Sequence, residues 1–317
     1  MYDVITIGSA TLDVFLSCEN LTVIESNGEK NISFPYGAKI EVDDVLFETG
    51  GGGTNTATTF ARLGFKTAVI AKIGEDFAGE KVIERVKMEG IDTSFLTIAK
   101  DETTDFSTII WAPHKGSVIL VNRGKGKLEI NDVSWESLQT KWFYITSVEG
   151  NLEIINQCKN AFIAWNPGKR ELKQPEAVLD ILGNIEVLIL NRREATQLLN
   201  APADDLNQLL SKAATLPPSY ILITDGHNGS YLRHHNHQWL HAGVFTIDRK
   251  EATGAGDAFG SGFVAAHLQG LNNEDCLKLA SANAASVVTS PSAKQGILRK
   301  EQVGEWLGRE LTITSIT

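Results

Sequence analysis

The chain has 317 residues, of which 42% are hydrophobic and 21% charged, a composition typical of a soluble globular protein with a substantial core. Its net charge of −10 argues against a nucleic-acid partner, although a local pocket can still be positive. The three cysteines are far apart and no apolar run has the length of a membrane span or a secretory signal, so we expect a cytoplasmic protein.

Short apolar runs alternate with helical stretches along most of the chain. The first run, Val4 to Ile7, ends at Gly8 and has the pattern of a buried strand. The same pattern predicts strands over Thr67–Ile73, Trp142–Ile145, Ala161–Trp165, Val187–Leu190 and Tyr220–Thr224. Helices are predicted over Thr56–Leu63, Glu80–Glu89, Leu152–Lys159, Pro175–Leu182, Glu194–Leu199, Asp204–Ala214, Gly260–Gly270 and Asn273–Thr289. This alternation predicts an α/β fold with a mostly parallel sheet between helices.

Two regions, approximately residues 15–47 and 95–130, interrupt this alternation. The second contains runs of β-branched residues, such as Ser107–Trp111 and Ser117–Val121. We expect both regions to form a small β-strand lid on a single α/β domain that spans residues 1–317. Ligands of such sheets bind at the carboxyl ends of the parallel strands, so we expect the site there.

The segment Gly254-Ala255-Gly256-Asp257 is the most informative motif, because an apolar helical pattern follows it at once. Small residues allow a backbone to approach an anion closely, and the N–H groups that open a helix attract negative charge. An aspartate beside a phosphate in transfer can take the proton of an attacking hydroxyl group. The motif therefore indicates phosphoryl transfer to an alcohol.

A second glycine cluster, Gly50-Gly51-Gly52-Gly53-Thr54-Asn55, also precedes a predicted helix. Four glycines expose backbone that a polar ligand can reach, and the Asn55 amide can both donate and accept hydrogen bonds. We interpret the two glycine clusters as two halves of one site.

With these motifs, the chain resembles the ribokinase (PfkB) family of carbohydrate kinases nearly from end to end. The resemblance rests on the order and spacing of five motifs: Gly50-Gly51-x-Gly53-x-Asn55, Asn191-x-x-Glu194, Thr224-Asp225-Gly226-x-x-Gly229, Gly254-Ala255-Gly256-Asp257 and Asn283-Ala284-Ala285. It implies a three-layer ribokinase-like fold with a small β lid. It also implies an ATP-dependent kinase that transfers the γ-phosphoryl group to a hydroxymethyl group of a sugar or sugar derivative.

The resemblance also implies a role for each matching residue. Asp257 resembles the catalytic base, and the backbone N–H groups of Gly254, Ala255 and Gly256 resemble the anion hole for the transferred phosphoryl group. The remaining implied contacts are Asp13, Gly50, Gly51 and Asn55 for the acceptor, Asn191 and Glu194 for Mg²⁺ and the phosphates (partly through water), and Thr224, Gly226, Gly229 and Asn283 for the nucleotide.

Departures from the family pattern leave the acceptor and a monovalent cation open. Glu251 stands where the family often has the aspartate that ligates such a cation, so K⁺ activation is an open alternative. Gly52 replaces a lysine of ribokinase, which puts ribose in doubt as the acceptor. Arg123 and Lys125 are either contacts for a phosphate or carboxylate on the acceptor or parts of a charged lid turn.

Three other functions are weighed against a sugar kinase. A nucleoside kinase of the same fold would use aromatic lid residues, for which Phe34, Phe106 and Trp111 are candidates. A catalytically silent member would bind sugar or nucleotide without turnover, and a redox enzyme is the most distant alternative. The partner is expected to be a small molecule, and exposed lid edges predict a homodimer through the lid.

Overall fold

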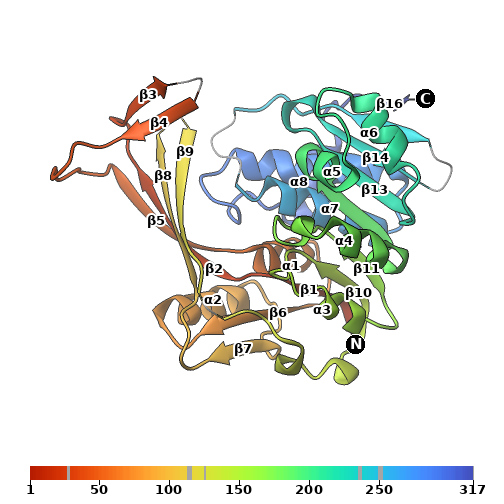
Figure 1. Cartoon of the computed structure of the whole chain (residues 1–317), viewed down its shortest axis with the longest axis horizontal. Helices are drawn as coiled ribbons and strands as arrows, with labels where there is room; N and C mark the ends of the chain where they lie inside the picture. Colours follow the sequence, from red (N-terminus) through yellow and green to blue (C-terminus); the bar gives the residue numbers. More distant parts are fainter. Residues whose placement is uncertain (27–28, 113–115, 125, 235–237, 249–252, 317) are drawn as a thin grey trace.

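The apolar runs of the sequence form a ten-stranded sheet in the order β16-β15-β14-β13-β12-β11-β10-β1-β6-β7 (Figure 1). This computed structural model describes residues 1–26, 29–112, 116–124, 126–234, 238–248 and 253–316. Neighbouring strands from β7 to β13 are parallel, whereas β14, β15 and β16 continue the sheet in antiparallel pairs. The strands are β1 Tyr2–Ile7, β6 Thr67–Gly74, β7 Leu96–Ala99, β10 Thr140–Ile145, β11 Phe162–Trp165, β12 Val187–Asn191, β13 Tyr220–Thr224, β14 Ser230–Arg233, β15 Trp239–Ala242 and β16 Ile313–Ile316.

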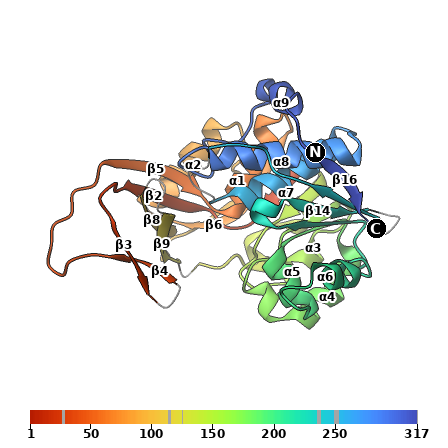
Figure 2. The same cartoon turned by 90° about the horizontal axis from the view of Figure 1, so that it is seen from above.

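Helices cover both faces of this sheet (Figure 2). They are α1 Gly52–Arg62, α2 Phe77–Met88, α3 Glu153–Gln157, α4 Pro175–Ile181, α5 Arg192–Leu199, α6 Leu206–Ala213, α7 Ala255–Leu268, α8 Asn273–Val288 and α9 Lys300–Leu307. Because successive side chains of a strand point to opposite faces, Val4 packs in the core under α1, α7 and α8, and Ile5 packs in the core under α3 to α6. The predicted three-layer α/β fold is confirmed.

Several predicted bounds were wrong, and the error at α7 matters for function. This helix begins at Ala255 rather than Gly260, so Asp257 lies inside its first turn. Helix α1 likewise begins at Gly52, within the glycine cluster. Helix α2 begins at Phe77, where Asp76 accepts a capping hydrogen bond from the N–H of Gly79. Helix α9 and strand β16 were not predicted.

A second, four-stranded sheet in the order β5-β2-β8-β9 extends beside the carboxyl ends of the parallel strands (Figure 1). Its strands are β2 Thr11–Ser17, β5 Asp44–Gly50, β8 Asp105–Ala112 and β9 Gly116–Asn122, and the ribbon of β3 Thr22–Ser26 and β4 Glu29–Ser33 lies at its far end. These strands overlap the two regions predicted as a lid, approximately 15–47 and 95–130, but β2 begins earlier, at Thr11, β5 runs on to Gly50, and the sheet ends at Asn122. Leu96–Ala99, at the start of the second region, instead pairs with β6 in the main sheet.

No helix in the described ranges is long and apolar enough to span a membrane.

Candidate active site

Asp257 lies in the first turn of α7, at the carboxyl ends of the parallel strands. Its Oδ2 atom accepts a hydrogen bond of 2.9 Å from Nδ2 of Asn55 in α1, so the structure brings the two glycine clusters together. Because an ionised carboxylate only accepts hydrogen bonds, this contact fixes the orientation of the Asn55 amide. The Oδ1 atom of Asn55 is buried and has no hydrogen-bond partner in the described part of the chain. It is therefore an unsatisfied hydrogen-bond acceptor close to the carboxylate of Asp257.

The electrostatic setting of Asp257 suits a base. Burial raises the pKa of its carboxyl group, while the hydrogen bond from Asn55 and the charge of Lys294 act in the opposite direction. The residue keeps some accessible surface, and it lines a cavity. A carboxylate with a raised pKa is a stronger proton acceptor when it is ionised.

The loop before α7 presents backbone N–H groups to the same cavity. Gly254 is in the left-handed conformation, with φ of 81°, and a Cβ atom there would lie 2.4 Å from Cβ of Ala293, so the position requires glycine. The first N–H groups of a helix, here those of Ala255 and Gly256, have no partners within the helix. Such N–H groups, together with the helix dipole, can bind an anion.

A cavity of about 200 Å³ separates Asp257 from the start of helix α5. Asn191 and Glu194 line it and form a capping box, in which Asn191 Oδ1 accepts from the N–H of Glu194 at 2.9 Å and Glu194 Oε2 accepts from the N–H of Asn191 at 2.8 Å. Burial raises the pKa of Glu194, and its hydrogen bonds with Asn191 lower it. The capping box engages Oε2 of Glu194, which leaves Oε1 as an oxygen that could hold a cation in this cavity.

The described residues contain no group of three or more His, Cys, Asp or Glu side chains placed to hold a metal. Mg²⁺ usually keeps several waters and takes only one or two protein carboxylates besides substrate phosphates, so the Glu194 cavity fits this ion without such a group. Glu251, predicted for a monovalent cation, lies outside the described residues, as does Lys125.

A larger cavity, of about 360 Å³, lies on the other side of the α7 N-terminus. Thr224, Gly226 and Gly229, the predicted nucleotide turn, line it after strand β13. Its other walls come from the 243–247 loop and from helices α7 and α8, through Gly243, Val244, Phe245, Ile247, Ala255, Gly256, Phe259, Ser281, Ala284, Ala285 and Val288. A mostly apolar cavity of this size, open to an anion site, has the character of a nucleotide pocket.

Asn283, predicted near the adenine, does not line this cavity. Its side chain is fully buried between helices, where Nδ2 donates to the carbonyl of Ala258 at 2.8 Å and Oδ1 accepts from the N–H of Leu298 at 2.9 Å. The cavity wall is formed instead by Ser281, Ala284, Ala285 and Val288 on another face of α8. Helical periodicity could have found them, because they recur at intervals of three and four residues.

Asp13 and the first two glycines of the cluster lie close together. A Cβ atom on Gly50 would lie 1.9 Å from Oδ2 of Asp13, so the carboxylate fills the place of a side chain. Gly51 has φ of 90°, and a Cβ atom there would lie 2.4 Å from the carbonyl oxygen of Ser9. Asp13 is buried and accepts a hydrogen bond of 3.0 Å from Thr11. Burial raises its pKa, opposed by hydrogen bonds from Thr11 and Ser107.

Lys294 is a buried cation that the sequence did not reveal. Its ammonium group donates to the carbonyl and hydroxyl oxygens of Thr49 at 2.7 and 2.9 Å and to the Thr54 hydroxyl at 2.7 Å. These two threonines flank the glycine cluster, so the hydrogen bonds of Lys294 hold both ends of the cluster. No motif or periodicity in the sequence around Lys294 predicts that its side chain is buried against the glycine cluster.

Comparison with known proteins identifies the family. The family model for pfkB family carbohydrate kinases matches residues 1–300. The chain belongs to this family. It is similar to a ribokinase of Haemophilus influenzae, with 26% identity over 91% of this chain and 98% of the relative, and to a 5-dehydro-2-deoxygluconokinase of Clostridium perfringens, with 26% identity over 82% of this chain and 84% of the relative. The predicted class of enzyme, kinases with an alcohol acceptor, is confirmed.

Solved structures confirm the ribokinase-like fold of this pfkB family member. Arabidopsis thaliana ribokinase complexed with ribose and ATP superposes with a TM-score of 0.79 and 20% identity, covering 98% of this chain and 99% of that one. The Burkholderia thailandensis nucleoside kinase in complex with inosine superposes with a TM-score of 0.76 and 15% identity, covering 96% of this chain and 97% of that one. Sugar kinases and nucleoside kinases thus share this fold.

Proposed function

We propose that this protein is an ATP-dependent sugar kinase in which Asp257 takes a proton from a hydroxymethyl group of the acceptor. The observation that carries this proposal is the hydrogen bond between Asp257 and Asn55 beside the N-terminus of α7. This contact supports the proposal because it joins Asp257, in the first turn of α7, to Asn55 of the other glycine cluster. The proton of the hydroxyl moves to Asp257 as the oxygen attacks the γ-phosphorus, and ADP leaves.

Three further groups have defined roles in this proposal. The N–H groups of residues 254–256 stabilise the charge on the transferred phosphoryl group, and removal of one such donor typically reduces the rate about 10²–10³-fold in other enzymes. Asp13, Gly50, Gly51 and Asn55 hold the acceptor, while Thr224, Gly226 and Gly229 bound the nucleotide pocket. Asn283 acts by packing α8 against α7 rather than by touching adenine.

Glu194 and Asn191 would hold Mg²⁺ with the phosphates, partly through water. Bound there, the ion would neutralise phosphate charge. Activation by K⁺ through Glu251 stays a prediction.

The sheet β5-β2-β8-β9 serves as the lid of this proposed site, and two copies of the chain associate through it. The regular pairing of β8 places Phe106 and Trp111 five residues apart on one strand, hence on opposite faces. These two rings therefore cannot enclose the same base. This arrangement counts against a nucleoside whose base is held between Phe106 and Trp111.

The test is ADP release from Mg·ATP with a panel of pentoses, hexoses, sugar acids, sugar phosphates and nucleosides, with and without K⁺. For the preferred acceptor we expect Asp257→Asn to lower kcat by about 10²–10⁴-fold, because a general base contributes this much, while ATP binding by calorimetry is retained. Full activity in this variant would exclude Asp257 as the base. A nucleoside as the best acceptor would assign the protein to the other branch of the fold.

A further inference from the structure

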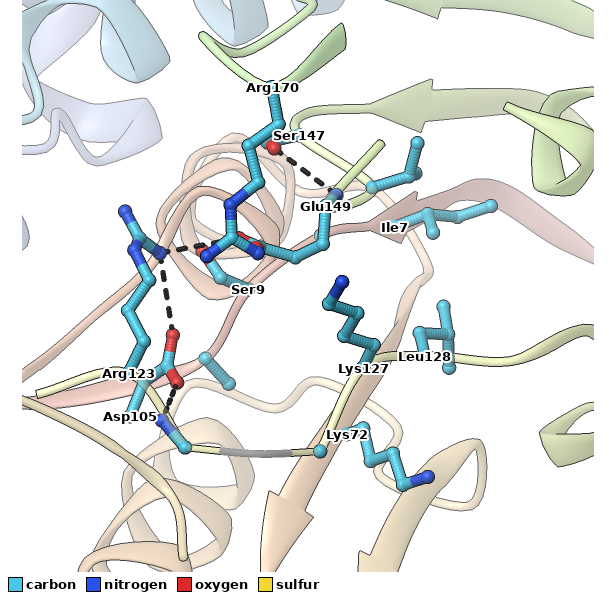
Figure 3. A pocket seen from close by; sticks show the side chains of 15 residues that line it. Ile7, Ser9, Lys72, Asp105, Arg123, Lys127, Leu128, Ser147, Glu149 and Arg170 are labelled. Carbon is cyan, nitrogen blue, oxygen red and sulfur yellow. Dashed lines mark hydrogen bonds and ion pairs between the residues drawn. The ribbon is translucent and has the colours of Figure 1, made fainter. Parts of the chain in front are cut away.

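We infer that the acceptor carries an anionic group, a carboxylate or a phosphate, that binds to Arg123, Arg170 and Lys127. This inference rests on the proposed function, because it assigns the opposite end of the same acceptor. The three cations line a cavity bounded by residues 7–10, 72, 105, 123–124, 126–128, 147–149 and 170 (Figure 3).

The cavity adjoins the glycine cluster directly. Ser9 forms part of its wall, and the hydroxyl of Ser9 accepts a hydrogen bond of 3.2 Å from the N–H of Gly52, while its carbonyl accepts one of 3.0 Å from the N–H of Gly53. Asn55 lies one turn further along α1, and its amide donates a hydrogen bond to Asp257 in α7. Ser9 and the glycine cluster thus connect this cavity with the Asn55–Asp257 pair, and we place there the end of the acceptor that is opposite its reacting hydroxyl group.

The cations in the cavity exceed the carboxylates that face them. Arg123 contacts Glu149 at 3.2 Å and Asp105 at 3.6 Å, and Arg170 is paired with the other oxygen of Glu149. In Figure 3 the two guanidinium groups approach Glu149 from different directions, and the Lys127 ammonium points into the same space. Within the described residues, no ion pair engages Lys127. Three cations thus face two carboxylates, in a chain whose net charge is −10.

The fourth cation of the lining, Lys72, belongs to a different contact. Its ammonium group pairs with Asp132 at 3.3 Å and with Glu102 at 3.9 Å, and it points away from the cavity in Figure 3. Its charge is therefore engaged by these two carboxylates, and it is not counted as a ligand of the anion.

The two guanidinium groups have more N–H donors than their ion pairs require, and the remaining donors can bind an anion. A guanidinium group has five N–H donors in a planar fork that matches a carboxylate or phosphate in bidentate contact. The nearest contacts of Arg123 with Asp105 and Glu149, and that of Arg170 with Glu149, are made by Nη1. The cavity volume of about 40 Å³ holds roughly three water molecules, which is close to the size of a carboxylate.

The backbone around Glu149 is held in an uncommon conformation. Glu149 has φ of 58° and is followed by Gly150 with φ of 85°. A non-glycine residue in the left-handed region costs free energy that the surrounding structure must offset, and such positions gather at functional sites. Here the conformation places one carboxylate between two arginines from separate elements.

An anion bound here would also link the two sheets. Arg123 follows lid strand β9, whereas Arg170 follows β11 of the main sheet. One acceptor contacting both arginines would hold the lid against the body while its hydroxyl end is at Asp257. The subsite therefore couples acceptor charge to lid position.

The test compares three acceptors of equal carbon number, a neutral sugar, the sugar acid and the sugar phosphate, in wild type and in Arg170→Met and Arg123→Met. For the anionic acceptor that wild type prefers, we expect KM to rise about 10- to 100-fold in each variant, with KM for ATP unchanged, because a charge-assisted hydrogen bond is lost. Arg309→Met is the matched control, since Arg309 is a similarly exposed arginine paired with Glu305 far from the site. Thermal melting establishes that each variant is folded.

Two outcomes separate this inference from the proposed function. A preference for the neutral sugar, with KM unchanged in Arg170→Met and Arg123→Met, overturns the anion subsite and leaves the kinase intact. Calorimetric binding of the sugar acid or sugar phosphate without turnover, weakened by Arg170→Met, sustains the subsite and overturns the kinase. Preference between the acid and the phosphate identifies which anion the cavity takes.

Discussion

Lys294 connects the acceptor side of the site with its catalytic base. Its charge lowers the pKa of both Asp13 and Asp257, and three oxygens of Thr49 and Thr54 accept hydrogen bonds from its ammonium group. Three acceptors match the three donors of a protonated lysine. Desolvation opposes that charge, and burial lowers the pKa of Lys294 to about 7.

This lowered pKa predicts a pH-dependent contribution to stability. Between pH 7 and the unfolded pKa of 10.5, the unfolded chain binds a proton at Lys294 that the folded chain has lost, so the free energy of unfolding rises with pH across this window. Below pH 7 both states are protonated and the burial penalty is present in full. In Lys294→Met we expect this rise to disappear, measured as urea-unfolding free energies at intervals from pH 7 to 10.

The exposed Lys87 provides the control, because Lys87→Met should keep the wild-type slope. An identical slope in wild type and Lys294→Met would show that the lysine does not change protonation on folding in this range.

At the scale of elements, the N-terminus of α7 has two glycines with different requirements. Gly254 needs φ of 81° and has the Cβ of Ala293 against it, whereas a Cβ on Gly256 would meet nothing within 4 Å. Gly256 also lies between the nucleotide cavity and the cavity of Glu194. The first glycine is required by the fold, and the second leaves space for a ligand.

This difference predicts opposite effects of two alanine substitutions. Gly254→Ala should lower the free energy of unfolding by about 2 kcal/mol or more, from left-handed strain and the clash with Ala293. Gly256→Ala should keep or raise stability by up to about 1 kcal/mol, since alanine favours a helix, but its methyl group should raise KM for ATP. Urea unfolding and steady-state kinetics on both variants check this. Equal stability of Gly254→Ala and wild type would contradict the strain.

The elements that sequence predicted well are those with a periodic signal. Buried runs such as Val187–Leu190 form strands because four apolar residues between helical stretches fit a sheet covered on both faces. The starts of α1 and α7 were placed too late because glycine has low helix propensity, yet here it opens the helix to leave space for ligands. Strand β7 was assigned to the lid because the sequence of a β-rich run does not show which strand it pairs with.

The site residues also divide into those that a sequence motif predicted and those that no local pattern indicated. Asp257 and Asn55 were predicted from motifs, and the structure adds the direct contact between them. Arg170 and Glu149 carried no local signal, because their function depends on which strand ends meet at one edge of the sheet. Asn283 belongs to a recognisable motif, but tertiary packing places its amide in the interface between α7 and α8.

At the scale of the whole molecule, the order of the strands in the main sheet determines the order of the three cavities. The nucleotide cavity lies after β13 to β15, the cavity of Glu194 after β11 and β12, and the basic cavity after β1, β10 and β11. Nucleotide, transferred phosphate and acceptor therefore follow one another along the carboxyl edge of the sheet. The lid approaches this row at the acceptor end, where Asp105 begins β8 and Arg123 directly follows β9.

The lid also exposes an apolar strand that predicts dimerisation. Strand β9 is the edge of the lid sheet, and Val118, Ile119, Leu120 and Val121 on it are 39–56% exposed. Four consecutive exposed apolar residues place apolar surface on both faces of an edge whose backbone groups are unpaired on one side, which favours association with a second copy. We expect sedimentation velocity to show a dimer that dissociates on dilution, and Leu120→Lys to shift it to monomer.

The matched control is Ile98→Lys, because Ile98 is 51% exposed on the edge strand β7 of the other sheet and should leave the dimer intact. A monomer at every concentration of wild type would contradict association through the lid, and equal loss of the dimer in both variants would place the contact elsewhere.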